Sequence, residues 1–172
     1  RGLAEEAGVA AEVDFLIVTF SKSLGAIGAF CASNHDGLEL IRYASRPYIF
    51  TASLSPSTVA SVRTALRILG SRPGLREQLW DNARHLHERL RSLGFAVGPE
   101  PGPIIAVRCS TVEEAFAKWN GLLERGIYVN MVLPPATPDG GALLRCSLSA
   151  AHTREQIERI GAAFADLVDR PA

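Results

Sequence analysis

Short apolar runs separated by polar or glycine-containing segments fill the N-terminal part of the chain. Val13–Val18 is an apolar run of the kind expected for a strand buried on both faces. Gly28–Ser33, rich in small residues, and Tyr48–Ala52, rich in β-branched and aromatic residues, predict two more strands. Ser55 followed by Pro56 predicts a helix start, and apolar residues at helical spacing continue that helix. This order is typical of the end of a larger α/β sheet.

The pattern changes after Ser71–Gly74, which is the best candidate for a domain boundary. An amphipathic helix is predicted over Leu75–Leu93, with Gly94 ending it. The remaining apolar pattern predicts strand, helix, strand, strand and helix, which suits helices packed on a mostly antiparallel sheet. The predicted strands are Ile104–Cys109, Ile127–Val132 and Leu143–Leu148, and the predicted helices follow capping boxes at Thr111 and Thr153, the first burying Phe116, Trp119 and Leu123.

Composition narrows the class of protein. The 172 residues are 47% apolar and 21% charged, which is ordinary for a globular protein with a substantial core. Basic and acidic residues number 18 each, so no net charge attracts nucleic acid or an anionic membrane. No apolar segment is long enough for a transmembrane span and no signal peptide is visible. Cys31, Cys109 and Cys146 lie in predicted strands and indicate reduced core thiols in a cytoplasmic protein.

Lys22 is the strongest candidate for chemistry, because it is one of only two lysines and lies in Thr19–Gly25, directly after a predicted strand. A lysine partly withdrawn from water has a lowered pKa, and its neutral amine can attack a carbonyl, which an arginine cannot do. Small residues after it would let a flat ligand and its phosphate approach the backbone. By itself, such a lysine also fits a structural role, with its ammonium group reaching from a strand end into water.

The segment Thr19-Phe-Ser-Lys-Ser-Leu-Gly25 resembles the pyridoxal-phosphate lysine motif of the α-oxoamine synthases, a branch of the fold-type I pyridoxal-phosphate enzymes. Further family segments, in the same order, are resembled by Arg46–Ser53, Pro134–Pro138 and Leu144–Thr153. The residues of these segments are most similar to those of the bacterial serine palmitoyltransferase branch. The resemblance implies an α/β fold, the C-terminal part of the aspartate aminotransferase-like, PLP-dependent transferase fold. Residues 1–74 would end the large cofactor-binding domain, and residues 75–172 would form the small α+β domain.

The same resemblance assigns roles to individual residues. Lys22 would hold pyridoxal phosphate and remove the Cα proton of the amino acid. The hydroxyls of Thr19 and Ser21 would bind the cofactor phosphate, and Thr51 would reach that phosphate in the neighbouring subunit of a homodimer with shared active sites. Arg145 would bind the substrate carboxylate. Capping a turn or packing toward the core remains an alternative role for the hydroxyls. An internal salt bridge remains an alternative role for Arg145.

The implied reaction is a decarboxylative condensation of an amino acid with an acyl-CoA. Serine and palmitoyl-CoA, giving 3-ketodihydrosphingosine for sphingolipid biosynthesis, are the favoured substrates. The 8-amino-7-oxononanoate synthases and glycine C-acetyltransferases share the motifs and remain alternatives, and a non-catalytic dimerisation partner is an alternative of another class. The family's aspartate and histidine at the cofactor ring precede the lysine and have no match here, so we expect these 172 residues alone to be inactive. His85 and His87 face different ways on a helix, and no metal site is predicted.

Overall fold

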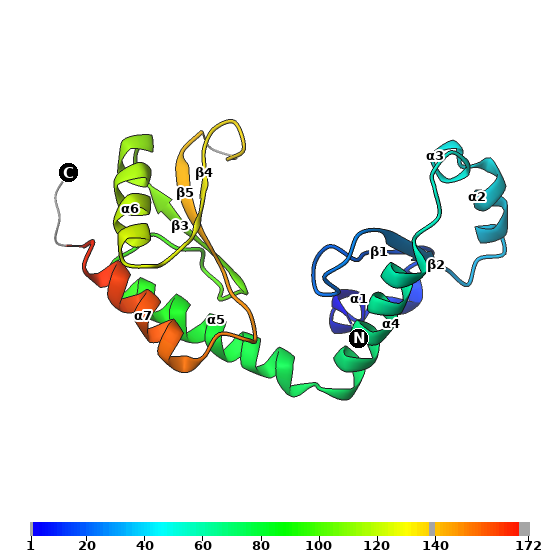
Figure 1. Cartoon of the computed structure of the whole chain (residues 1–172), viewed down its shortest axis with the longest axis horizontal. Coiled ribbons are helices and arrows are strands. Elements are labelled where there is room, and N and C mark those ends of the chain that lie inside the picture. The colour runs from blue at the N-terminus through cyan, green and yellow to red at the C-terminus, as the bar shows by residue number, and fades with distance from the viewer. Residues whose placement is uncertain (1, 138–139, 169–172) are drawn as a thin grey trace. The chain divides into compact units, whose positions relative to one another are not determined.

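The structure is a computed structural model that describes residues 2–137 and 140–168. The chain divides into two compact units, Arg1–Arg72 (unit 1) and Pro73–Ala172 (unit 2), each described here by itself (Figure 1). Unit 1 contains α1 (Leu3–Glu6), η1 (Ala10–Glu12), β1 (Leu16–Thr19), β2 (Ala29–Ala32), α2 (Leu38–Ala44), α3 (Arg46–Ile49) and α4 (Pro56–Ser71). Unit 2 contains α5 (Gly74–Ser92), β3 (Ile104–Cys109), α6 (Val112–Glu124), β4 (Asn130–Val132), β5 (Ala142–Ser147) and α7 (Arg154–Ala165).

The two strands of unit 1 form an antiparallel pair in which Leu16 lies opposite Ala32 and Thr19 opposite Ala29. The strand predicted over Gly28–Ser33 is therefore confirmed. The prediction that Val13–Val18 is a strand buried on both faces is wrong in its burial: β1 begins at Leu16 and Ile17 is 72% exposed. A two-stranded sheet has no inner strand, and the elements of unit 1 leave most of β1 uncovered.

The strand predicted at Tyr48–Ala52 is wrong. The short helix α3 occupies Arg46–Ile49, with Pro47 in its first turn. The fixed φ of proline suits a helix there, and its lack of an N–H costs nothing because N–H groups of the first turn make no hydrogen bond within the helix. The hydroxyl of Thr51 then donates to the carbonyl oxygen of Pro47. Strand preference depends on a neighbouring strand to pair with, so these local contacts decide the conformation here.

Helix α4 starts as the sequence predicts. The Ser55 hydroxyl accepts a hydrogen bond from the Thr58 N–H at 3.2 Å, and Pro56 occupies the first turn. Its apolar residues, Val59, Val62, Leu66 and Leu69, recur at helical spacing, but only Val62 is buried. The helix therefore presents an apolar stripe that unit 1 covers only in part.

Unit 2 is built on a three-stranded antiparallel sheet in the order β3-β5-β4. The predicted order of elements is confirmed, and β3 has the predicted bounds. Three alternate residues of β5 are buried, namely Ala142, Leu144 and Cys146. They pack against α5, α6 and α7, which lie on the same side of the sheet (Figure 1). The other face carries the remaining residues of β5, among them Arg145, which is exposed.

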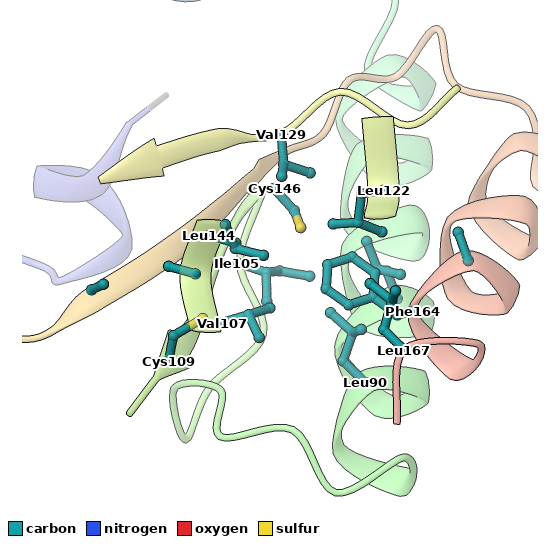
Figure 2. Close-up of a cluster of buried hydrophobic side chains, with 14 of the residues drawn as sticks. Leu90, Ile105, Val107, Cys109, Leu122, Val129, Leu144, Cys146, Phe164 and Leu167 are labelled. Carbon is teal, nitrogen blue, oxygen red and sulfur yellow. The ribbon is translucent and has the colours of Figure 1, made fainter. Parts of the chain in front are cut away.

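Phe164 of α7 lies at the centre of the unit 2 core and has no exposed surface. Figure 2 shows its ring between side chains from the sheet and from the helices, with Leu90 and Leu122 nearby. The Phe95 ring meets it edge-on, with 5.2 Å between ring centres. The capping box predicted at the start of α7 is confirmed, since Thr153 and Gln156 each accept the other's backbone N–H.

Helix α6 begins at the predicted Thr111 cap but buries a different face. Ala115 and Leu122 are fully buried, whereas Phe116 is 44% exposed. One residue of helix turns the buried face by about 100°, since a turn has about 3.6 residues. Trp119 lies at the edge of this face, and its indole N–H donates to the Val129 carbonyl at 2.9 Å. Among the described helices, none combines the length and apolar character that crossing a bilayer requires.

The three thiols are in different environments, and this gives a first prediction. Cys109 and Cys146 are buried, and burial raises the pKa of Cys146 to about 12, whereas Cys31 is exposed, contrary to its predicted core position. The thiolate is the reactive form. With iodoacetamide at pH 8, we expect rapid alkylation of Cys31 alone, and labelling of the other two only in urea. Mass spectrometry of the digest gives the modified positions. Early labelling of Cys146 would show that the unit 2 core opens.

Candidate functional site

The turn that carries Lys22 is anchored in the core of unit 1 by two buried side chains. Phe20 and Leu24 are 5% and 7% exposed, while Ser21, Lys22 and Ser23 between them are exposed. Backbone hydrogen bonds fix the turn at both ends, from the Phe20 N–H to the Gly28 carbonyl and from the Ala26 N–H to the Phe20 carbonyl, each 2.9 Å long. The alternation of apolar and polar residues therefore presents an amine and two hydroxyls together on a fixed loop.

Gly28 is required for this turn to pack. Its φ is +115°, and a Cβ there would lie 2.7 Å from a methyl carbon of Leu54 and 3.2 Å from the Phe20 ring. Any other residue would therefore have to displace the Leu54 side chain and would crowd Phe20, which supports the loop, and it would also hold an unfavourable φ.

The two lysines of the chain differ in their availability. The ammonium group of Lys118 donates to Glu114 and lies 5.1 Å from the centre of the Phe95 ring. The hydrogen bond from Lys118 is the main cause that holds the pKa of Glu114 below its usual value. The side chain of Lys22 has no hydrogen-bond or ion-pair partner among residues 2–137 and 140–168. Its amine is thus free for a ligand, although unit 1 does not supply the partial withdrawal from water that the sequence predicts.

The hydroxyls proposed to bind a phosphate differ in their present contacts. Thr19 ends β1 and Ser21 lies in the turn, so both are close to Lys22 along the chain and exposed. Thr51 follows α3, is also exposed, and uses its hydrogen to bond the Pro47 carbonyl, which leaves its oxygen able to accept only. An amine, two exposed hydroxyls and adjacent small residues match what an aldehyde with a phosphate group needs.

Arg145 lies in the middle of β5, opposite Ala106 of β3 and Asn130 of β4. Its side chain is exposed and forms no hydrogen bond or ion pair with another residue in the described part of unit 2. The internal salt bridge that the sequence leaves open is therefore not formed there. The small Ala106 on one side and the amide of Asn130 on the other leave the guanidinium accessible to a carboxylate. Sequence reasoning missed Asn130, because only strand register reveals this pairing.

The Pro134–Pro138 loop follows β4 directly. Of these residues, Pro138 lies outside the described ones, and the Pro134–Pro135 bond is cis. The Thr137 side chain is nearly buried and donates to the Gly141 carbonyl at 2.6 Å, a contact across the loop that the apolar pattern did not indicate. His85 pairs with Glu158 and His87 bonds the Gly98 carbonyl, and no group of three possible metal ligands occurs in the described part of the chain.

Comparison with known proteins places these features in a family. The family model for aminotransferase class I and II matches residues 2–164. The serine palmitoyltransferase of Caulobacter vibrioides is 54% identical over 160 residues, which are 93% of this chain and 40% of that protein. The 8-amino-7-oxononanoate synthase of Alkaliphilus metalliredigens is 36% identical over 159 residues, 92% of this chain and 40% of its own.

Solved structures agree with the sequence relatives. The serine palmitoyltransferase of S. paucimobilis, with bound PLP–myriocin, is 47% identical, with a TM-score of 0.92 over 97% of this chain and 42% of that one. The fold expected from the motifs, part of a PLP-dependent transferase, is confirmed. The chain spans about 40% of the length of the curated relatives it matches. On the family match and this structural agreement together, the chain belongs to the aminotransferase class I and II family.

Proposed function

We propose that this chain carries the cofactor lysine and the substrate-carboxylate arginine of a serine palmitoyltransferase, which condenses L-serine with palmitoyl-CoA. The observation that carries the proposal is that the Lys22 side chain, on a fixed turn, has no partner in the described part of a chain 54% identical to a protein of that name. When bound, pyridoxal phosphate supplies the electron sink that stabilises a carbanion at Cα.

The residues of this chain would then divide the work. Lys22 would hold the cofactor through its amine, and the freed amine would accept the Cα proton of the substrate at Nζ. Thr19 and Ser21 would donate hydrogen bonds to the phosphate oxygens. Thr51 would donate to the phosphate in the neighbouring subunit of a homodimer, once its hydroxyl no longer bonds the Pro47 carbonyl. Arg145 binds the serine carboxylate with two parallel hydrogen bonds.

Cofactor trapping tests the proposal. We would mix the protein with pyridoxal phosphate, reduce with borohydride, digest, and locate the adduct by mass spectrometry, for this chain alone and for a longer protein that includes the remaining family length. We expect one pyridoxyl group on Lys22 in the longer protein, absent in Lys22→Ala. Equal labelling of Lys22 and Lys118, or no adduct on Lys22 in the longer protein, would contradict the assignment.

Arg145→Lys gives a second prediction, because lysine keeps the charge but cannot bind a carboxylate through two parallel bonds. In the longer protein we expect the KM for serine to rise about 10-fold to 100-fold, since a hydrogen bond to a charged group contributes about 1.5–3 kcal/mol. The KM for palmitoyl-CoA should stay within about twofold. Arg108→Lys, on a neighbouring strand of the same sheet, is the matched control. Steady-state kinetics with each substrate varied gives both constants, and equal changes in both would argue against a carboxylate role.

The 8-amino-7-oxononanoate synthases are the second candidate, because one is 36% identical over the same region. Assays with serine and with alanine, each with long-chain and short-chain acyl-CoA, separate the two. A stable hetero-oligomer without turnover would favour a non-catalytic partner instead. We place the protein in the cytoplasm, where buried thiols such as Cys109 and Cys146 remain reduced.

A further inference from the structure

Asn130 lies directly beside Arg145 on the face of the unit 2 sheet that α5, α6 and α7 leave uncovered, which we call the free face (Figure 1). Directly opposite residues of an antiparallel pair point to the same face, with about 4.5–5.5 Å between their Cβ atoms. Both side chains are exposed, whereas Met131, the next residue of β4, packs against the core. On the other side of Arg145 lies Ala106, which has no polar side-chain atom. Strand register therefore gives Arg145 one polar neighbour directly opposite it.

The Arg145 guanidinium has more hydrogen-bond donors than a carboxylate uses. It carries five N–H groups, and a carboxylate bound through two parallel bonds takes two of them. The three strands, all within the described residues, contain no aspartate or glutamate that could accept from the others. The side-chain oxygen of Asn130 is an acceptor in this position. Ser147, the next residue of β5 on the free face, is about 7 Å farther along the strand and is therefore less well placed.

Neither side chain is committed to another contact. The Asn130 amide, like the Arg145 guanidinium, has no hydrogen-bond partner among residues 2–137 and 140–168. An arginine that nothing holds loses rotamer freedom when it binds a ligand, and this loss weakens binding. An amide oxygen can hold the guanidinium in advance without cancelling its charge. A carboxylate in the same place would instead pair with the guanidinium and compete with the ligand.

We propose that Asn130 is a positioning residue for the amino-acid substrate. Its side-chain oxygen accepts a hydrogen bond from the Arg145 guanidinium and so directs two parallel N–H groups toward the substrate carboxylate. The proposal rests on the carboxylate role proposed above for Arg145 and names the residue that orients it. Because Asn130 contacts the arginine and not the reacting atoms, its loss should weaken serine binding and leave the chemical step unchanged.

The first test replaces the amide with a carboxylate in the longer protein. Asn130→Asp gives Arg145 an internal ion pair, with which serine must compete, so we expect the KM for serine to rise about tenfold or more. The KM for palmitoyl-CoA and kcat should stay within about twofold. Asn120→Asp is the matched control, since it makes the same substitution at an exposed residue of α6, across the sheet from the free face, and should leave all three constants unchanged. Titration calorimetry with serine alone gives its Kd without turnover, and that Kd should rise by the same factor as the KM.

The second test separates positioning from a structural role. Asn130→Ala alone should raise the KM for serine about threefold to tenfold, the effect of losing one hydrogen bond. In the Arg145→Lys background the same substitution should change it by less than about twofold, because the planar fork that Asn130 orients is no longer present. A structural contribution of Asn130 would instead be equal in both backgrounds. Since Asn130 is exposed, circular dichroism should show every variant folded.

The outcomes distinguish this inference from the proposed function. Equal serine constants for Asn130→Asp and Asn120→Asp, or equal effects of Asn130→Ala in the two backgrounds, would overturn the positioning role. If Arg145→Lys still raises the KM for serine in that case, the carboxylate role of the arginine stands and only the role of Asn130 is rejected. If Arg145→Lys leaves the KM for serine unchanged, both are rejected.

Discussion

We expect the replacement of Lys22 with arginine to reduce the proposed turnover in the longer protein by roughly a thousandfold or more, while the fold is unchanged. Arginine keeps the positive charge but stays protonated in proteins, so it can neither form an imine nor accept the Cα proton. Loss of the two roles proposed for Lys22 should therefore reduce kcat rather than substrate affinity. Lys22 is exposed on its turn, which means that arginine fits without repacking Phe20 or Leu24.

The measurement is kcat for product formation from serine and palmitoyl-CoA, together with borohydride trapping of the same sample. Lys118→Arg is the matched control, since arginine can keep the ion pair with Glu114, and we expect it to retain activity within about twofold. Unaltered turnover in Lys22→Arg would remove the lysine from the mechanism. A large loss with Lys118→Arg instead would move the cofactor site to unit 2.

Local chemistry made some parts of this structure predictable. The caps at Ser55, Thr111 and Thr153 were identified because a hydroxyl and the N–H three residues later are enough to define them. The strand Ile104–Cys109 was predicted as a mainly apolar segment that follows a loop rich in glycine and proline, and the structure buries alternate residues of it.

Other parts depend on contacts that a single segment does not encode. Tyr48–Ala52 has strand-forming residues but no strand beside it, and Phe116 is one residue out of phase with the buried face of its helix. The exposure of Arg145 follows from the register of β5 with β3 and β4, which sets the face on which each side chain lies. The cofactor role of Lys22 was predicted from its motif alone and stays a prediction, and the described residues of unit 1 leave its side chain exposed.

Phe164→Ala should lower the free energy of unfolding of unit 2 by about 3–5 kcal/mol, the range for truncating a large buried side chain. The ring is fully buried and packs edge-on against Phe95, so alanine leaves a cavity between the sheet and the helices (Figure 2). Phe116→Ala is the matched control, and because that ring is 44% exposed we expect a loss of less than about 1.5 kcal/mol.

Tryptophan fluorescence during urea unfolding of the full chain measures this directly. Both tryptophans, Trp80 and Trp119, lie in unit 2, so the signal reports that unit alone. Trp119 is also hydrogen-bonded to the Val129 carbonyl, which places it beside the core that Phe164 fills. The midpoint should fall sharply for Phe164→Ala with the slope unchanged, because the surface exposed on unfolding stays nearly the same. Equal midpoints for the two variants would mean that Phe164 does not organise the core, and that the helices hold the sheet through other contacts.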